Sequence, residues 1–193
     1  MSSAQARPPA VDATAGARAA RLLGWPGVAL PPMMLFGVRV LPVVVLDDDA
    51  HRARQAVGDG PQLDGDTLAV WEWPESAAHV PPSVVSVSGL LILNPDPAGR
   101  RWRAALARAR NVRGFGPAAV LSAVDTADEV PRLEHAFHGI GLVAAGADCD
   151  ALVPAASGRA PRARRRTADR WVEELLYAAA IDAGHLQTGA DTP

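Results

Sequence analysis

Acidic and hydroxyl side chains follow several short apolar runs that have the composition of buried strands. Asp47 and Asp48 come directly after one run, Asp96 follows a second, and Ser122 closes a third. In open parallel sheets, ligands bind beyond the carboxyl ends of the strands. Oxygen atoms such as these are the ligands that Mg²⁺ takes in proteins. The pattern predicts a Mg²⁺ site made by Asp47, Asp48 and Asp96. Ser122 is then placed to hold a phosphate.

The same carboxylates have a purely structural interpretation. Asp is a common residue in the loop and at the N-cap after a strand, where its side chain accepts a hydrogen bond from the first turn of the next helix. In that case Asp47 and its neighbours begin helices and bind no cation. The sequence leaves both interpretations open.

Arginine provides all 19 basic residues, because the chain contains no lysine. A guanidinium group does not deprotonate in proteins, so enzymes that need a lysine nucleophile, Schiff base or general base are excluded. The net charge is −2, but the charges are unevenly placed. Residues 47–96 hold nine acids and two arginines, whereas residues 97–124 hold six arginines and no acid. This asymmetry predicts a basic surface.

Two segments concentrate the arginines. Residues 99–110 have the apolar spacing of a helix whose arginines face outward, and residues 159–166 read RAPRARRR, with the composition of a loop. The predicted anion-binding residues of these segments are Arg100, Arg101, Arg103, Arg162, Arg164, Arg165 and Arg166. Contiguous arginines neutralise phosphates without reading base sequence, so the expected binding is non-specific and sensitive to salt. A solvated helix face and self-association of acidic with basic patches are alternative explanations.

Apolar runs alternate with helical segments through most of the chain. Strands that alternate with helices of about 10–15 residues are typical of βαβ units. The alternation predicts one doubly wound, flavodoxin-like α/β domain with about five parallel strands and helices on both faces. Pro42 cannot donate to a sheet ladder and is expected to interrupt the first apolar stretch. The predicted strands are Met33–Val40, Val43–Leu46, Thr67–Trp73, Gly89–Leu93, Ala118–Ser122 and Gly141–Ala144.

The domain organisation follows from the composition along the chain. The last helix has apolar residues at i, i+3 and i+4 spacing and is expected to cover the sheet. The segment before it is rich in Gly, Pro, Ala and Arg and has no apolar period. The predicted divisions are a disordered tail at 1–14, an α/β core at 15–146, an Arg/Pro/Gly-rich loop at 147–166, the helix at 167–184 and a tail at 185–193.

Cysteine content and hydropathy indicate in which cellular compartment the protein is expected. Cys149 is the only cysteine, so a disulfide within the chain and a cysteine zinc site are excluded. The N-terminal residues lack the continuous apolar segment of a secretory signal. The longest apolar stretch, residues 27–46, is interrupted by three prolines and Arg39, whereas a membrane-spanning helix needs about 20 mostly apolar residues. We expect a cytoplasmic protein that does not bind membranes.

Two stretches of the sequence carry a family resemblance, VVVLDDDAHRARQAV and AAVLSAVDTADEVPRLEHAFHGIGLVAAG. The first resembles the opening strand, acidic pair and first helix of response-regulator receiver domains. The second is similar to the fourth strand, fourth helix and fifth strand of that family. The resemblance covers roughly residues 43–146. It implies that Asp47 and Asp48 are the acidic pair that binds Mg²⁺, and that Ser122 is the hydroxyl residue ending strand four. Asn94 stands where the family has its phosphate-accepting Asp, and no lysine follows residues 141–144, where the family has one.

We expect the chain to be a non-catalytic regulatory or interaction module with a receiver-like fold. Its arginine-rich helix and loop would contact an anionic partner, which is a protein, a nucleic acid or a second copy of the chain. The alternative is a Mg²⁺-dependent enzyme that acts on a phosphate ester or nucleotide at the carboxyl ends of the strands. The enzyme requires Asp47 and Asp48 to converge with Asp96 in one pocket, whereas the interaction module requires only the arginine surface.

Overall fold

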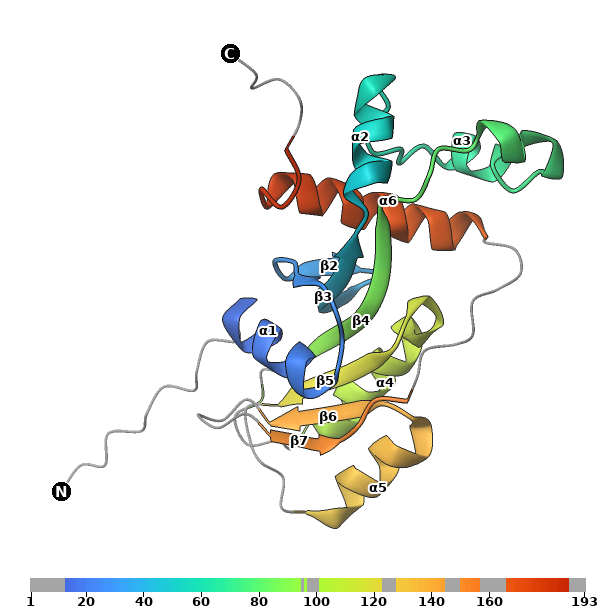
Figure 1. Cartoon of the computed structure of the whole chain (residues 1–193). Coiled ribbons are helices and arrows are strands. Elements are labelled where there is room, and N and C mark those ends of the chain that lie inside the picture. The colour runs from blue at the N-terminus through green and yellow to red at the C-terminus, as the bar shows by residue number, and fades with distance from the viewer. Residues whose placement is uncertain are drawn as a thin grey trace.

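A computed structural model of the chain describes residues 13–94, 96, 101–122, 128–144, 150–156 and 166–187. These residues form one seven-stranded sheet flanked by helices (Figure 1). The spatial order of the strands is β1-β3-β4-β5-β6-β7, and β2 also pairs with β3. The strand bounds are β1 Val28–Ala29, β2 Met33–Leu35, β3 Val38–Leu46, β4 Val85–Asn94, β5 Ala118–Ser122, β6 Gly141–Ala144 and β7 Asp150–Val153.

Parallel pairing is confined to the neighbouring strands β4, β5 and β6. β1, β2 and β4 are antiparallel to β3, and β7 is antiparallel to β6. The α/β class is confirmed, but the prediction of about five parallel strands is wrong. The chain leaves β3 and returns to the sheet at the same edge, where the Asp47 N–H donates to the Val84 carbonyl at 2.9 Å. β4 therefore starts beside the end of β3 and runs in the opposite direction.

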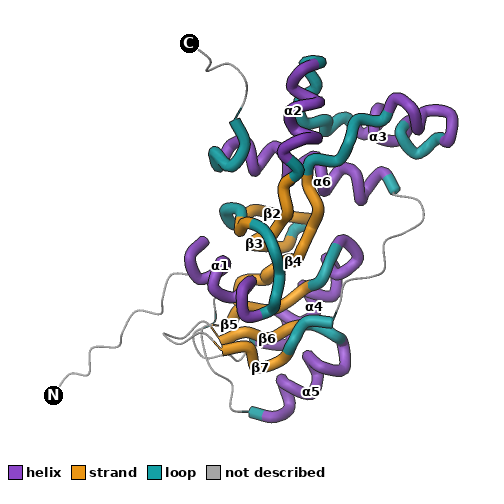
Figure 2. Tube along the Cα trace, viewed as in Figure 1, coloured by secondary structure: helices purple, strands orange, loops and turns teal. Residues whose placement is uncertain are grey.

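The excursion between β3 and β4 is helical. It contains α2 (Asp48–Ala56), α3 (Gly65–Val70) and the 3-10 helix η1 (Pro74–His79), and α2 and α3 lie beyond the end of β3, near α6 (Figures 1 and 2). The predicted strand Thr67–Trp73 is wrong, because Thr67 lies in the first turn of α3. The Asp64 carboxylate caps that turn, accepting hydrogen bonds from the Thr67 N–H at 2.8 Å and from its hydroxyl at 2.7 Å. A capped turn prevails here over an apolar run too short to distinguish strand from helix.

Pro42 lies inside β3 and does not interrupt it, contrary to the prediction. Its carbonyl accepts a hydrogen bond from the Leu30 N–H at 2.9 Å, on the side of β3 that faces β1 and β2. β2 pairs with β3 as far as Val40, and β1 pairs with it from Val43 onward. The N–H that Pro42 lacks therefore falls in the gap between two short strands, where proline is tolerated.

Side chains of β4 alternate between two cores, as the pleat of a strand requires. Leu90 and Ile92 pack in the core that contains side chains of α4 and α6. Leu91 and Leu93 pack in the core that contains side chains of α1. α4 and α6 thus cover one face of the sheet and α1 covers the other. The bounds of the remaining helices are α1 Ala13–Leu22, α4 Trp102–Val112, η2 Arg113–Phe115, α5 Glu129–His138 and α6 Thr167–Asp182.

Parts of several predicted segments lie outside the described residues. These parts are residues 1–12 of the predicted tail, residues 147–149 and 157–165 of the predicted loop, and residues 188–193. Four of the predicted anion-binding residues also lie there, namely Arg100, Arg162, Arg164 and Arg165. In the part of the chain that the structure describes, none of the helices combines the length and apolar character needed to cross a bilayer.

Candidate functional site

The acidic residues after β3 lie at the start of α2. The Asp47 carboxylate accepts a hydrogen bond from the Ala50 N–H at 2.9 Å, as an N-cap residue does. Asp48 and Asp49 occupy the first turn of the helix, where the helix dipole favours negative charge. Asp47 therefore has the N-cap position that the structural interpretation assigns to it.

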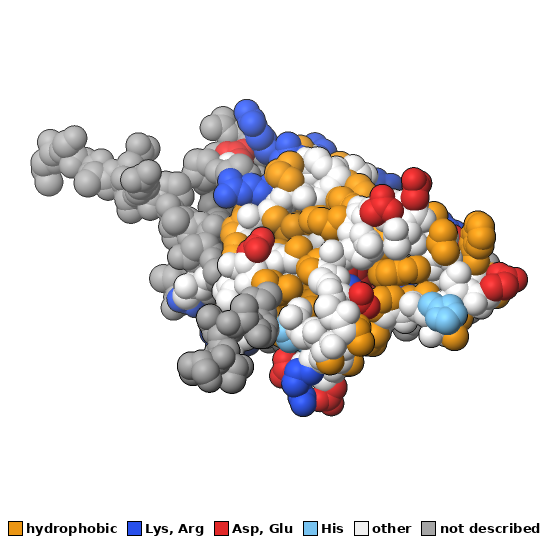
Figure 3. Space-filling model, turned by 90° about the horizontal axis from the view of Figure 1, so that it is seen from above, with side chains coloured by type: hydrophobic (Ala, Val, Ile, Leu, Met, Phe, Trp, Pro, Cys, Tyr) orange, Lys and Arg blue, Asp and Glu red, His pale blue; other side chains and the backbone are white. Residues whose placement is uncertain are grey.

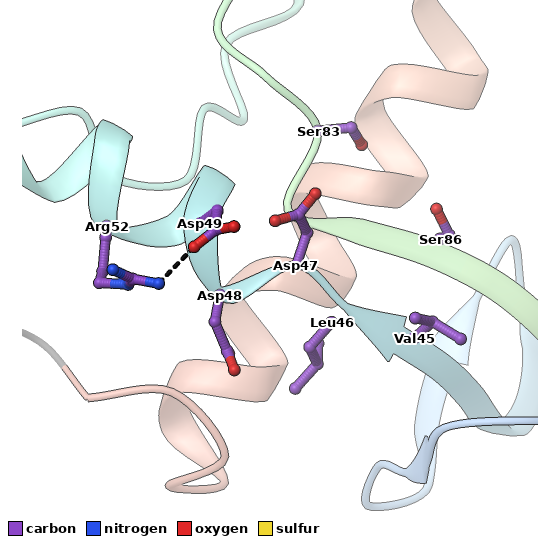
Figure 4. Close-up of a pocket in the computed structure, with 8 residues that line it drawn as sticks. All are labelled: Val45, Leu46, Asp47, Asp48, Asp49, Arg52, Ser83 and Ser86. Atoms are coloured by element: carbon purple, nitrogen blue, oxygen red, sulfur yellow. Dashed lines mark hydrogen bonds and ion pairs between the residues drawn. The ribbon is translucent and has the colours of Figure 1, made fainter.

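An open depression of about 470 Å³ lies beside these residues (Figure 4). The Asp48 side chain points away from those of Asp47 and Asp49, since successive residues of a helix are rotated by about 100°. Asp49 instead forms an ion pair with Arg52. The acidic pair predicted from the sequence therefore does not present two converging carboxylates. The residues lining the depression are Val45, Leu46, Asp47, Asp48, Asp49, Arg52, Ser83 and Ser86.

Asp96, the third predicted Mg²⁺ ligand, lies at the end of β4 that is far from Asp47 and Asp48. β3 and β4 are antiparallel, with Leu46 opposite Val85, so the end of β3 adjoins the start of β4. Asp96 follows the end of β4, one ten-residue strand away. At about 3.3 Å per residue, the separation is about 30 Å. The structure does not bring Asp47 and Asp48 together with Asp96. Among the described residues, no three His, Cys, Asp or Glu side chains are grouped to hold a metal ion.

The carboxyl ends of β4 and β5 place two buried polar residues side by side. Asn94 lies opposite Ser122 in the parallel register, and the two are only 3% and 2% exposed. Side chains two residues apart in a strand lie on the same face. Asn94 therefore lies on the face of Leu90 and Ile92, and Ser122 lies on the face of Val120. Those apolar residues pack in the core that α4 covers. Asn94 and Ser122 therefore both lie on the α4 side of the sheet.

Asp96 links this strand edge to the start of α4. Its N–H donates to the Asn94 Oδ1 atom at 3.3 Å, and its Oδ2 atom accepts from the Arg101 N–H at 2.9 Å. Asp96 and Arg101, both predicted from the sequence, thus contact each other, and the predicted residue Ser122 lies opposite Asn94. Asn94 is not among the predicted site residues, although it ends the run GLLILN, where a polar residue after five apolar ones marks the end of a buried strand. We call Asn94, Asp96, Ser122 and the first turn of α4 the β4–β5 edge site.

Arginines cover the outer side of α4. The helix buries Ala105, Leu106, Ala109 and Val112 against the sheet and contains no acidic residue. We call its arginines and those that flank it the α4 basic surface, and all are exposed: Arg101, Arg103, Arg108, Arg110 and Arg113. The Arg103 guanidinium lies over the Trp102 ring, 4.6 Å from its centroid. Arg166, the one described arginine of the predicted loop segment, is exposed at the N-terminus of α6.

One arginine of the α4 basic surface also contacts a neighbouring helix. Arg113 donates to the His138 carbonyl at 2.6 Å, which ties the end of α4 to α5. Ion pairs among the described residues are formed by Arg52, Arg54 and Arg170, none of which belongs to α4. On the face seen in Figure 3, acidic side chains occur singly or in small groups between exposed apolar ones.

Comparison of the chain with protein-family models, with curated proteins and with solved structures gave no match.

Proposed function

We propose that the chain is a non-catalytic interaction module that binds an anionic partner through the α4 basic surface. The observation that carries the proposal is the set of exposed arginines on and beside a helix without an acid. Guanidinium groups on one helix attract a partner of opposite charge and neutralise phosphates or carboxylates on it. The proposal leaves out metal-dependent catalysis. That alternative needs Asp47 and Asp48 to converge with Asp96, and the rise of about 3.3 Å per residue along β4 separates them by about 30 Å.

The packing of α4 supports this proposal. Ala105, Leu106, Ala109 and Val112 anchor one side of the helix in the core, so the backbone that carries the arginines is held in place. Only the flexible side chains then lose freedom when a partner binds, which reduces the entropic cost of association. A rigid basic helix therefore suits repeated contacts with a polyanion better than a basic loop does.

Charge reversal on α4 tests the proposal. Fluorescence anisotropy would measure the affinity of the full chain for a labelled oligonucleotide and for labelled poly-glutamate, at low and at physiological salt. The Arg108→Glu/Arg110→Glu double variant should weaken binding to whichever polyanion the chain prefers, because it replaces attraction with repulsion at two contacts. Preference for the oligonucleotide would identify a nucleic-acid partner, and preference for poly-glutamate an acidic protein.

A matched control distinguishes a local surface from net charge. Arg21 and Arg39 are exposed on α1 and β3, and both belong to the side of the sheet opposite α4. Arg21→Glu/Arg39→Glu changes the net charge by the same amount and should leave the affinity nearly unchanged. Equal losses in the two double variants, or no binding by the wild-type chain to either polyanion, would contradict the proposal. Sedimentation at low salt would show whether a second copy of the chain is the partner.

A further inference from the structure

The side-chain amide of Asn94 is buried without an acceptor. The residue is 3% exposed, and its Nδ2 atom has no hydrogen-bond partner among the residues that the structure describes. The orientation of the amide is fixed, because the Asp96 N–H needs the oxygen, Oδ1, as its acceptor. Nearly all buried polar groups in proteins are hydrogen-bonded, so an unpartnered donor of this kind calls for an acceptor beyond those that the described residues supply.

The first turn of α4 offers further donors beside this amide. The first hydrogen bond within the helix runs from the Ala105 N–H to the Arg101 carbonyl. The side chain of Arg101 does not cap the helix. The N–H groups of Trp102, Arg103 and Ala104 therefore have no carbonyl partner within the helix. Asp96 connects the two sets of donors, since it bonds both the Asn94 side chain and the Arg101 N–H. Free N–H groups and the helix dipole together favour an anion at this position.

We infer that the β4–β5 edge site binds the phosphate group of a small ligand, or an oxyanion of the same shape. Asn94 Nδ2 would donate one hydrogen bond, the first turn of α4 would donate others, and the Arg101 and Arg103 guanidinium groups would neutralise the charge. Ser122, opposite Asn94 in the sheet, would border the ligand on the β5 side. The position lies at the carboxyl ends of the parallel strands β4 and β5, the end of the strands at which ligands bind in open α/β sheets. This inference goes beyond the proposed function, which concerns the outer side of α4.

The Asp96 carboxylate makes the site respond to mutation in a characteristic way. It lies at the start of α4 and bonds the Arg101 N–H, so its charge opposes that of a bound oxyanion. Asp96→Asn keeps a side-chain oxygen for that N–H and removes the charge. The variant should therefore bind inorganic phosphate more tightly than the wild-type chain does. A purely structural role for Asp96 predicts no gain.

Amide NMR of the full chain during titration with inorganic phosphate tests the inference. Phosphate should shift the Asn94 side-chain NH₂ signals and the backbone signals of Arg103 and Ala104. Asn94→Leu should weaken the binding about tenfold or more, as loss of a hydrogen bond to a charged group does. It should change the midpoint of thermal unfolding little, because removal of the unpaired buried donor offsets loss of the acceptor for the Asp96 N–H. Asn111→Leu, at an exposed position of the same helix, should leave phosphate binding unchanged.

The outcomes separate this inference from the proposed function. Shifts that are lost in Asn94→Leu, gain strength in Asp96→Asn and persist in Arg108→Glu/Arg110→Glu would support the edge site. Absence of shifts at millimolar phosphate, or equal shifts in Asn94→Leu, would overturn it even if polyanions bind to the α4 basic surface. A large fall in the unfolding midpoint of Asn94→Leu would assign Asn94 a structural role and also overturn the inference.

Discussion

An ion pair between Arg54 and Glu174 joins α2 to α6 in the interior of the protein. The two side chains are 1% and 2% exposed and form parallel hydrogen bonds of 2.7 and 2.9 Å. The Gln62 N–H donates to the same carboxylate at 2.8 Å, and the Arg54 guanidinium lies 4.9 Å from the centre of the Tyr177 ring. His51 bonds the Tyr177 hydroxyl at 2.8 Å. These contacts hold the helical segment between β3 and β4 against α6 through largely buried polar groups.

Breaking this pair from one side is expected to destabilise the fold. Glu174→Gln should lower the free energy of unfolding by about 3–5 kcal/mol, because it leaves the Arg54 charge buried without a counter-charge. Chemical denaturation would measure the change. Asp49→Asn is the matched control, since its ion pair with Arg52 is exposed and should contribute at most about 1 kcal/mol. Similar losses in the two variants would show that the buried pair is not a special source of stability.

His135 makes the stability depend on pH. Its ring is fully buried, with Nδ1 bonded to the Gly141 carbonyl at 3.3 Å, and burial lowers the pKa of the imidazole below its ordinary value of 6.5. As the pH falls below about 6.5, the unfolded chain takes up a proton that the folded chain does not, so the free energy of unfolding decreases. Unfolding curves across this range should show the loss in the wild-type chain and a smaller one in His135→Gln. Parallel pH profiles would contradict the assignment.

At the scale of elements, the tight turn between β2 and β3 depends on backbone conformation. Phe36 and Gly37 both have positive φ angles, 49° and 75°. Two residues of this kind form the hairpin turn whose twist matches that of the flanking strands. Phe36 is held there by stacking on Phe115, with ring centres 4.9 Å apart, and by a contact with Trp171 at 5.5 Å. The aromatic contacts compensate for a conformation that a residue with a large side chain rarely adopts.

Gly37→Ala should destabilise the protein by about 1–2 kcal/mol, because an L-residue is strained at this φ angle. Gly114→Ala is the control, since Gly114 does not have a positive φ angle and a Cβ atom at either glycine would meet nothing within 4 Å. The control should change the free energy of unfolding by at most about 0.5 kcal/mol. Thermal or chemical denaturation of both variants would measure the two changes in the free energy of unfolding. Equal effects would mean that backbone strain does not account for the glycine at position 37.

Burial in the core and local helix caps together explain which elements the sequence predicts. The strands around Leu90, Val120 and Val143 are continuous apolar runs bounded by turn residues, and the structure has strands there. The predicted strand Thr67–Trp73 fails because its start lies in a turn capped by Asp64, and a single cap decides the conformation of a segment that buries only Leu68 fully. Hydrophobic pattern is therefore reliable where the core enforces it and weak where the segment is mostly exposed.

At the scale of the whole molecule, strand direction decides which site residues meet. The sequence correctly predicts polar residues at strand ends, but apolar runs contain no information on whether neighbouring strands are parallel. The excursion returns where the Asp47 N–H bonds the Val84 carbonyl, and β4 pairs antiparallel with β3 from there on. That single reversal separates Asp47 from Asp96 and keeps Asp96 with Ser122. The exposed arginines of α4, by contrast, are predicted from helical spacing alone, because one amphipathic helix needs no partner to orient them.

The slope of oligonucleotide affinity against salt concentration tests the central claim most directly. On logarithmic scales, each arginine–phosphate contact contributes about 0.7 to the slope for a single strand and about 0.9 for a duplex. If Arg108 and Arg110 contact the partner, Arg108→Glu/Arg110→Glu should reduce the slope by about 1.4–1.8, and Arg21→Glu/Arg39→Glu should leave it nearly unchanged. An unchanged slope in the α4 variant, or the same reduction in the control, would contradict the assignment of the α4 basic surface as the binding surface.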